Sequence, residues 1–185
     1  MTTVLSPTTV IVEGISDRIA VETLAAKLGR DLDGEGISVV AIGGAQAIGN
    51  FLGGLGGQMR VAGLCDAGEE PGFRRALERG GLGTDLDRAA MEKLGFFVCV
   101  RDLEDELIRA LGPDVVEEVV AEHGDLRPLR TLQKQAAWQG RPKQDQLRRF
   151  MGSGGRRKIR YARFLVDALD AAQVPRPLRG LLASI

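Results

Sequence analysis

Histidine, tryptophan and tyrosine each occur only once in this sequence, and cysteine occurs twice. The single histidine, His123, leaves one candidate base for a catalytic triad, and its place near the end of a predicted helix indicates a structural role. Cys65 and Cys99 lie in apolar stretches and define neither a metal motif nor a disulfide framework. We therefore expect two reduced, buried thiols and no chemistry that depends on histidine or cysteine.

Long hydrophobic runs and aromatic residues are also scarce. The longest apolar stretches have the length of strands, which excludes a transmembrane helix. Met1–Pro7 lacks the basic start and the apolar core of a signal peptide, so a cytoplasmic location is expected. Aromatic residues make up only 4% of the chain. Trp138 and Tyr161 are the only tryptophan and tyrosine, and base stacking on them is possible, but packing is the better interpretation of Trp138 because few aromatic residues are available to form a platform.

The sequence has no net charge, but its charges are unevenly distributed. Residues 1–126 carry 22 acidic and 11 basic side chains, whereas residues 127–163 carry 12 basic side chains and one acidic one, Asp145. The 12 basic residues are Arg127, Arg130, Lys134, Arg141, Lys143, Arg148, Arg149, Arg156, Arg157, Lys158, Arg160 and Arg163. Charge runs are often solvated helix faces, but an acidic body beside a basic segment is also what a metal site next to a polyanion groove requires.

Strand-like and helical patterns alternate over the first half of the chain. Apolar, largely β-branched stretches predict strands at 8–13, 37–42, 60–65 and 96–100. Helical patterns follow at 16–28, about 71–79 and about 85–94, and a further helix begins after Gly43-Gly44. This alternation predicts an α/β fold with a mainly parallel four-stranded sheet flanked by helices.

No strand pattern follows Asp102. Helical patterns occupy 102–111, 113–123, 126–137, 144–150, 157–169 and 177–182. We therefore divide the chain into an α/β catalytic core at 1–111 and a basic, all-helical C-terminal extension at 112–185 that packs on the core. Gly152–Gly155 is the one flexible break predicted within this extension.

Acidic residues follow three of the predicted strands directly. Glu13 comes after the first strand, Asp66 after the third, and Asp102 and Glu104 after the fourth, while Asp17 lies in the first turn of the first helix. The carboxyl ends of parallel strands share one edge of a sheet, and converging carboxylates are unfavourable unless a cation offsets their charge. Any one of these acids alone is better explained as a helix cap. Together they predict a Mg²⁺ or Mn²⁺ site suited to phosphoryl transfer.

Two glycine-rich stretches give weaker evidence for phosphate binding. Gly53–Gly57 lacks the lysine of a P-loop and is better interpreted as a loop. The backbone N–H groups of Gly43-Gly44 could face a phosphate at the start of a helix, but a tight strand–helix turn explains this pair equally well.

The motifs around the acidic residues resemble a Toprim domain, the catalytic module shared by topoisomerases, bacterial primases and the OLD-family (overcoming lysogenisation defect) endonucleases. The matching stretches read V-E-G-I-S-D at 12–17, G-L-C-D-A-G at 63–68 and V-R-D-L-E-D-E-L at 100–107. The arrangement is most similar to the OLD-type version, in which a glutamate is followed four residues later by a second acid, as Glu13 is by Asp17. The resemblance covers about residues 8–111 and implies a Rossmann-like Toprim core that binds Mg²⁺ or Mn²⁺, with two ions as one option.

The resemblance also implies roles for individual residues. Glu13 would be catalytic and metal-binding, and the further metal ligands would be Asp17, Asp66, Asp102 and Glu104. The family uses a downstream lysine near the scissile phosphate, for which Lys158 is the best match, with Lys143 and Lys134 as fallbacks. The residues expected to hold the DNA backbone without reading its sequence are Arg148, Arg149, Arg156, Arg157, Lys158 and Arg160.

The sequence departs from the Toprim pattern at two points. The family's acidic pair is Asp-x-Asp, but Asp66-Ala67-Gly68 has glycine at the second acidic position, so Glu69 or Glu70 would have to supply the missing oxygen. These 185 residues also contain no G-x-x-x-x-G-K-[ST] motif. The ATPase that accompanies the Toprim module in OLD nucleases would then be a separate subunit.

The expected function is metal-dependent hydrolysis of DNA by an endonuclease or nickase, an activity typical of DNA repair, and a homodimer is compatible with it. Tyr161 is too isolated to indicate the covalent chemistry of topoisomerases. Two alternatives remain open. One is a catalytically degenerate Toprim module that binds nucleic acid or a partner ATPase without cleavage, and the other is a nucleotidyl transferase, for which no nucleotide site can be located.

Overall fold

A four-stranded parallel sheet forms the centre of the computed structural model, which describes residues 7–43, 46–54 and 60–185. The strands are β1 (Thr8–Val12), β2 (Ile37–Ala41), β3 (Arg60–Cys65) and β4 (Phe96–Val98), in the order β2-β1-β3-β4. All three strand pairs are parallel, and Val10 pairs with Val39 on one side and Ala62 on the other. The predicted parallel α/β sheet is confirmed. Gly44 and residues 55–57, which the sequence predictions included, lie outside the described residues.

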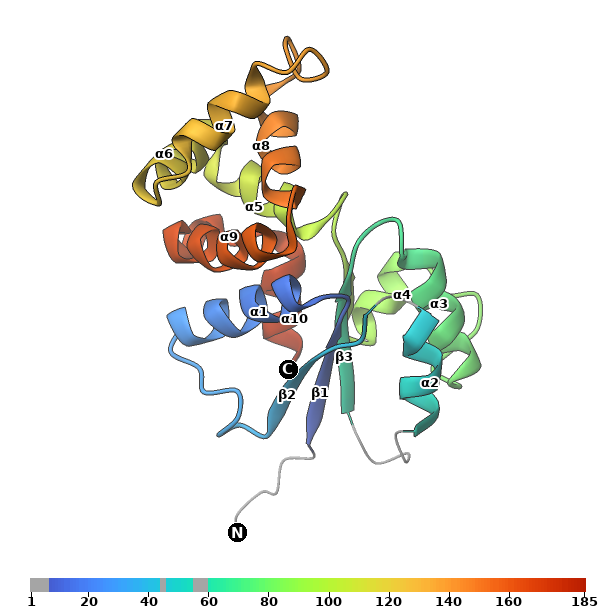
Figure 1. The fold of residues 1–185 in the computed structure, drawn as a ribbon. Helices are drawn as coiled ribbons and strands as arrows, with labels where there is room; N and C mark the ends of the chain where they lie inside the picture. Colours follow the sequence, from blue (N-terminus) through green and yellow to red (C-terminus); the bar gives the residue numbers. More distant parts are fainter. Residues whose placement is uncertain (1–6, 44–45, 55–59) are drawn as a thin grey trace.

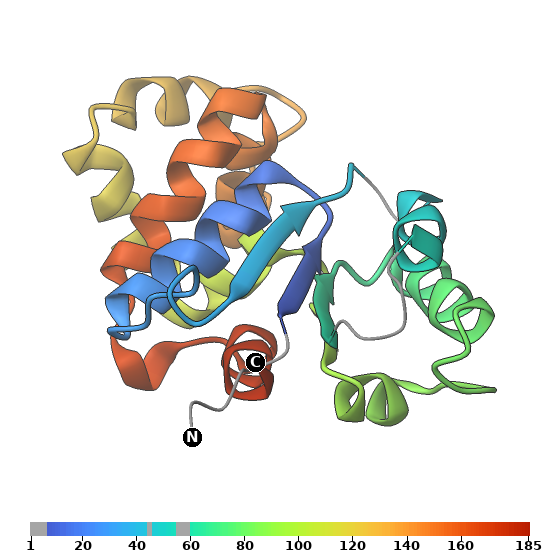
Figure 2. The same cartoon turned by 90° about the horizontal axis from the view of Figure 1, so that it is seen from below.

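Helices cover both faces of this sheet (Figures 1 and 2). On one face lie α2 (Gln46–Gly54), α3 (Glu70–Arg79) and α4 (Arg88–Lys93), and on the other lie α1 (Ile15–Lys27), α5 (Leu103–Leu111), α9 (Gly155–Ala168) and α10 (Arg176–Ser184). Val10 and Val12 pack into the cluster beneath α1, whereas Ile11 packs with Phe73 of α3. This two-sided burial explains why the strand sequence is apolar without alternation.

The remaining helices form a tier beyond the carboxyl ends of the strands (Figure 1). They are α6 (Pro113–Glu122), α7 (Leu126–Gln133) and α8 (Lys143–Gly152), and a short 3₁₀ turn, η1 (Ala171–Gln173), precedes α10. Helix α8 packs on α5 and α9, so its side chains reach the edge of the sheet where the strands end. Only Ser153 and Gly154 separate α8 from α9, which makes the predicted glycine-rich break shorter than expected.

The segment at 112–185 completes the covering of one face of the sheet. Helix α9 packs along α1, and α10 lies against β3 and β4. The close approach of α10 requires Gly180, because a Cβ atom there would lie 2.8 Å from Cδ1 of Phe97. One hydrophobic cluster therefore joins Val10 of β1 to Leu165 of α9 and Leu181 of α10. A domain boundary at residue 111 stays a prediction.

No strand follows β4 in residues 99–185, as the sequence predicts. Within the described part of the chain, no helix is both long enough and apolar enough to cross a membrane.

Candidate active site

Glu13 lies directly after β1 and ties this strand to its neighbour β3. Its Oε1 accepts the backbone N–H of Asp66 at 2.6 Å, while Oε2 has no hydrogen-bond partner among the described residues. Burial raises the pKa of Glu13, and the charges of Asp17 and Glu69 raise it further, against the hydrogen bond from Asp66 and the charge of Lys158. One oxygen of Glu13 therefore holds the backbone, and the other remains open to a ligand.

Asp17 is buried in the first turn of α1. Its Oδ2 accepts the backbone N–H of Gly14 at 2.8 Å, which closes the start of the helix. Burial is the main cause of its raised pKa. A helix cap and a metal ligand are thus compatible roles for this residue, since Oδ1 has no hydrogen-bond partner within the described ranges.

Asp66 follows β3 directly, and its carboxylate is acted on by the charges of the other acidic residues at this edge of the sheet. Burial and then the charges of Glu13, Asp17, Asp102 and Glu104 raise the pKa of Asp66 to about 8. Its carboxylate accepts no hydrogen bond from any described residue. The charges of four other carboxylates act on this one from the same edge of the parallel sheet, although no three of the described acidic side chains form a close group, and a cation there would favour the ionised form of all five.

Asp102 begins α5 and uses both of its oxygens. Oδ1 accepts the backbone N–H of Asp105 at 2.9 Å as a helix cap, and Oδ2 accepts the Nε–H of Arg148 at 2.6 Å. Burial opposes ionisation, but the hydrogen bond from Arg148 outweighs it together with the helix cap, and the pKa of Asp102 is lowered. Asp102 therefore carries a firmly held negative charge that anchors α8 to α5.

Glu104 faces Lys158 across the junction of α5 and α9. Its Oε2 lies 3.3 Å from Nζ of Lys158, and its Oε1 is buried with no hydrogen-bond partner in the described structure. Burial raises the pKa of Glu104. Burial alone would lower the pKa of Lys158, but the charges of Glu104 and Asp17 raise it above its ordinary value, so the ammonium keeps its charge.

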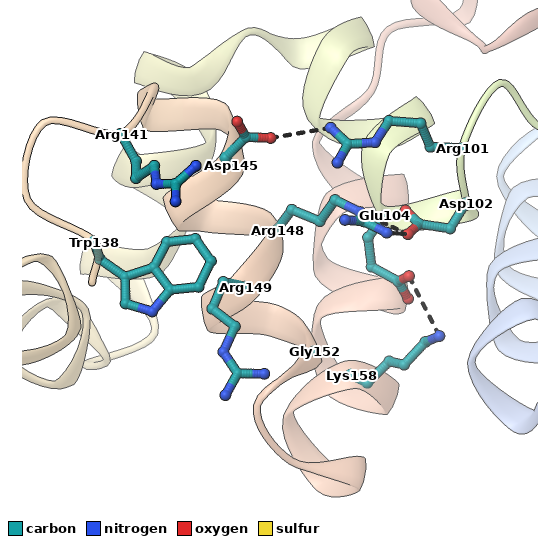
Figure 3. Close-up of a pocket in the computed structure, with 10 residues that line it drawn as sticks. All are labelled: Arg101, Asp102, Glu104, Trp138, Arg141, Asp145, Arg148, Arg149, Gly152 and Lys158. Carbon is teal, nitrogen blue, oxygen red and sulfur yellow. Dashed lines mark hydrogen bonds and ion pairs between the residues drawn. The ribbon is translucent and has the colours of Figure 1, made fainter.

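A pocket of about 480 Å³ opens beside Glu104 and Lys158 (Figure 3). It is lined by Arg101, Asp102, Glu104, Trp138, Arg141, Asp145, Arg148, Arg149, Gly152 and Lys158. Sequence reasoning did not identify Arg101, Arg141 or Asp145 as site residues. Arg101 alone had a usable signal, because it directly precedes Asp102 at the end of a predicted strand. Its guanidinium donates to Asp145 at 3.0 Å and holds α8 over the end of β4.

The structure brings only some of the predicted DNA-binding residues to this pocket. Arg148, Arg149 and Lys158 line it. Arg156 is exposed at the start of α9, Arg157 donates to Ser153 and to the carbonyl of Phe150, and Arg160 lies 3.7 Å from Asp125. Among the fallback lysines, Lys143 pairs with Asp114 at 2.7 Å and with Glu117 at 3.1 Å, whereas Lys158 lies 3.3 Å from Glu104. The catalytic role of Lys158 stays a prediction.

Comparison with known proteins identifies this arrangement. A family model described as "Overcoming lysogenization defect protein-like, TOPRIM domain" matches residues 5–59. The chain carries an OLD-like Toprim domain. The C-terminal region of the Xanthomonas campestris pv. campestris OLD protein superposes with a TM-score of 0.75 at 25% identity, covering 97% of this chain and 92% of that one. The corresponding region of the Burkholderia pseudomallei OLD protein gives 0.68 at 22% identity, covering 97% and 96%, and supports the fold. A comparison with curated protein sequences gave no match.

The position at which this Toprim domain departs from the family pattern is open to solvent. Gly68 is exposed, and a Cβ atom added there would meet nothing within 4 Å. Of the two candidate replacements, Glu70 is engaged by Arg88 at 2.7 to 3.0 Å. The carboxylate of Glu69 accepts no hydrogen bond among the described residues, and its charge acts on Glu13. Glu69 is therefore the better placed of the two to assist the acidic cluster.

The donor groups of this Toprim domain fit a hard divalent cation, although they are not preassembled around one. In the described residues, no three Asp, Glu, His or Cys side chains are close enough to form a metal site. The chemistry nevertheless matches: Glu104 has a buried oxygen without a partner, Asp66 has an unengaged carboxylate, and Glu13 and Asp17 each keep one open oxygen. Oxygen donors of this kind suit Mg²⁺ or Mn²⁺, and Toprim domains generally bind divalent metal ions.

Gly43 has a structural role in this domain. It has a positive φ of 74°, and its N–H donates to the backbone carbonyl of Glu13 at 2.9 Å. The N–H is therefore engaged in the turn that leaves β2 and does not face a phosphate.

Proposed function

We propose that this Toprim domain hydrolyses phosphodiester bonds of DNA in a divalent-metal-dependent reaction, as an endonuclease or nickase. The family to which its Toprim module is similar is one of nucleases. The observation that carries the proposal is the position of Glu13, Asp17, Asp66 and Glu104 along one edge of the sheet, just after the strands end, with Nζ of Lys158 3.3 Å from Glu104.

In this proposal Glu13, Asp17, Asp66 and Glu104 hold one or two Mg²⁺ or Mn²⁺ ions, and Asp102 and Glu69 assist from their flanks. When bound, the metal would neutralise phosphate oxygens and lower the pKa of a water molecule for attack. Glu13 has a second function, because its hydrogen bond to the backbone of Asp66 fixes the spacing of the two central strands.

The basic residues of the site would bind the phosphate backbone. Lys158 would exchange its contact with Glu104 for the scissile phosphate and stabilise the charge that develops there. Arg149 and Arg156 are exposed and without a carboxylate partner in the described structure, so they offer charge to flanking phosphates. Arg148 instead fixes Asp102 and acts on the site through that residue.

Supercoiled plasmid provides the direct test. Wild-type protein should nick or linearise it with Mg²⁺ or Mn²⁺ but not with EDTA. Glu13→Gln should reduce the rate by about 100-fold or more, since it removes an anionic ligand without changing shape. Glu122→Gln, at an exposed position on α6, is the matched control and should cleave like wild type. Absence of cleavage by wild type with either ion, or unchanged cleavage by Glu13→Gln, would contradict the proposal.

A second candidate function is favoured by Gly68 and by the absence of a preassembled ligand group in the described residues. In this case the Toprim module binds nucleic acid, or a separate ATPase subunit, without cutting. DNA binding in the presence of Mn²⁺ with no cleavage over hours would distinguish this function from the first. Nucleotidyl transfer, the ATPase partner, a homodimer and a cytoplasmic location stay predictions.

A further inference from the structure

We infer that the pocket beside Lys158 binds an unpaired nucleotide through Trp138, Arg141 and Arg149, so that the substrate is single-stranded DNA or a duplex with a single-stranded end. This inference rests on the proposed function, because it names the substrate class for the same site. Trp138 and Arg149 lie on the side of the pocket opposite Glu104 and Lys158 (Figure 3).

Trp138 is the only tryptophan of the chain and is held in place before any ligand arrives. It lies between α7 and α8, partly buried against the main hydrophobic cluster. Its backbone N–H donates to the carbonyl of Gln135 at 2.8 Å, and its own carbonyl accepts the Nε2–H of Gln146 at 2.8 Å. These two hydrogen bonds hold the backbone of Trp138, and packing against the cluster restrains its side chain, which also forms part of the pocket wall. A restrained aromatic ring loses less freedom when a base stacks on it.

Two arginines beside Trp138 have no carboxylate partner among the described residues. Arg141 and Arg149 are exposed, and neither forms an ion pair with a described residue. The guanidinium of Arg149 lies over the Trp138 ring, 6.0 Å from its centre, and would move aside to a phosphate when a base stacks on that face. By contrast, Arg148 and Lys158 are already paired with Asp102 and Glu104. The positive charge available to a new phosphate is therefore concentrated around the aromatic ring.

The arrangement selects an unpaired base over a duplex. In a duplex each base is covered by its stacked neighbours, so an aromatic side chain can reach a base face only after the base has left the stack. The volume of about 480 Å³ lies within the usual range for small-ligand pockets. A base on Trp138 would leave its phosphates between Arg149 and Lys158, which line the same pocket. Asp145 does not oppose this, because Arg101 offsets its charge at 3.0 Å.

Tryptophan fluorescence tests the inference without requiring catalysis. Because Trp138 is the sole tryptophan, its emission reports on this pocket alone. In EDTA, a thymidine 12-mer should quench the emission, whereas a 12-mer of the same charge with abasic sites, and a blunt 12-base-pair duplex, should quench it much less. Equal quenching by the abasic strand, or none by the thymidine strand, would overturn the inference.

Binding by variants, followed through the anisotropy of a labelled thymidine 12-mer in EDTA, provides an independent test. Trp138→Leu should weaken binding by roughly tenfold or more, and Trp138→Phe by less, since it keeps an aromatic face. Arg149→Gln should also weaken binding. Arg163→Gln makes the same charge change at an exposed position of α9 that lines a different pocket, beside α1, and should bind like wild type. Equal weakening by Arg149→Gln and Arg163→Gln would contradict the pocket assignment.

The two proposals fail in different ways. If wild type shows base-dependent quenching but never cleaves plasmid or oligonucleotide, the nucleotide pocket stands and the nuclease function is wrong. If wild type cleaves but abasic and thymidine strands quench and bind equally, the nuclease function stands and the nucleotide pocket is wrong.

Discussion

Three acidic residues at the edge of the sheet each use one carboxylate oxygen to accept a hydrogen bond from a backbone N–H. Glu13 accepts the N–H of Asp66, Asp17 that of Gly14, and Asp102 that of Asp105. These hydrogen bonds position the strand ends and helix starts, and they also orient the carboxylates. A structural role and a ligand-binding role are therefore compatible for Glu13 and Asp17, because each carboxylate accepts a backbone N–H with one oxygen and keeps the other open to a ligand.

The charge density at Asp66 predicts an unusual dependence of stability on pH. The pKa of Asp66 is raised to about 8, so between its ordinary pKa near 4 and that value the folded state binds more protons than the unfolded state. In EDTA, wild-type stability should fall as the pH rises through this range. Asp66→Asn should remove much of the decline and be more stable than wild type at pH 8.5, by about 1–3 kcal/mol after allowance for solvent screening.

Thermal unfolding of both proteins at pH 5.5, 7 and 8.5 in EDTA measures this difference. A pH dependence as steep in Asp66→Asn as in wild type would contradict the electrostatic description of the site.

Gly68 allows the family's acidic pair to be restored. The position is exposed, a Cβ atom there meets nothing within 4 Å, and its φ is not in the left-handed region, so an aspartate can be accommodated. Gly68→Asp should strengthen Mn²⁺ binding and raise the rate of plasmid nicking several-fold, because it adds an anionic oxygen donor two residues from Asp66. Isothermal titration with Mn²⁺ measures the affinity, and Gly68→Asn is the neutral control. An equal gain from both variants would show that charge is not the cause.

The acids of the site could be predicted from the sequence because a parallel sheet places all strand ends at one edge. Glu13, Asp66 and Glu104 needed only that rule. The pocket could not be predicted in the same way. Trp138 and Arg141 lie between α7 and α8, and they reach the pocket because α8 packs on α5, a contact that no local pattern encodes. Lys158 was found only through the resemblance to the family.

Helix α10 shows how one missing side chain sets the position of an element. Gly180 faces the ring of Phe97 with no room for a Cβ atom, so α10 lies directly on β3 and β4. The helix itself was predicted from its apolar spacing, but its site of docking was not, because a glycine in a helix has several explanations.

Gly180→Ala should destabilise the protein by about 1–3 kcal/mol, since overpacking forces Phe97 or the helix to move. Gly155→Ala, also in a helix but with nothing within 4 Å of the added atom, should change stability by no more than about 0.5 kcal/mol. Urea denaturation of the two variants beside wild type measures both effects. A similar loss in both would mean that contact with Phe97 is not responsible, because the change from glycine to alanine by itself favours a helix.

At the scale of the whole molecule, one hydrophobic cluster contains side chains from both sides of the predicted boundary at residue 111. One cluster contains Val10 and Leu24 from the first part and Phe150, Leu165 and Leu181 from the second. Burying each such side chain contributes about 1.5–3 kcal/mol. Because the net stability of a typical protein is only about 5–15 kcal/mol, the loss of several of these contacts would be enough to unfold the remaining part. The sequence indicated the change from α/β to all-helical composition and the packing of the extension on the core, but not which side chains share the cluster, because that depends on contacts between distant segments.

A fragment of residues 1–111 should therefore fail to unfold cooperatively, whereas the full chain should show one transition that is the same by circular dichroism and by Trp138 fluorescence. The fragment should also bind a hydrophobic dye, because the face of α1 that α9 covers would be exposed. A sharp thermal transition in the isolated fragment would instead support an independent domain ending near residue 111.

The ion pair between Glu104 and Lys158 has a consequence for biosynthesis. Glu13, the first acid of the site along the chain, is synthesised well before the lysine that faces Glu104, which belongs to α9. At about 5–20 residues per second, several seconds separate the two. A nascent chain that has produced its acidic edge therefore has no cation of its own to set against Glu104, and the complete arrangement arises only when α9 has emerged and docked on α1.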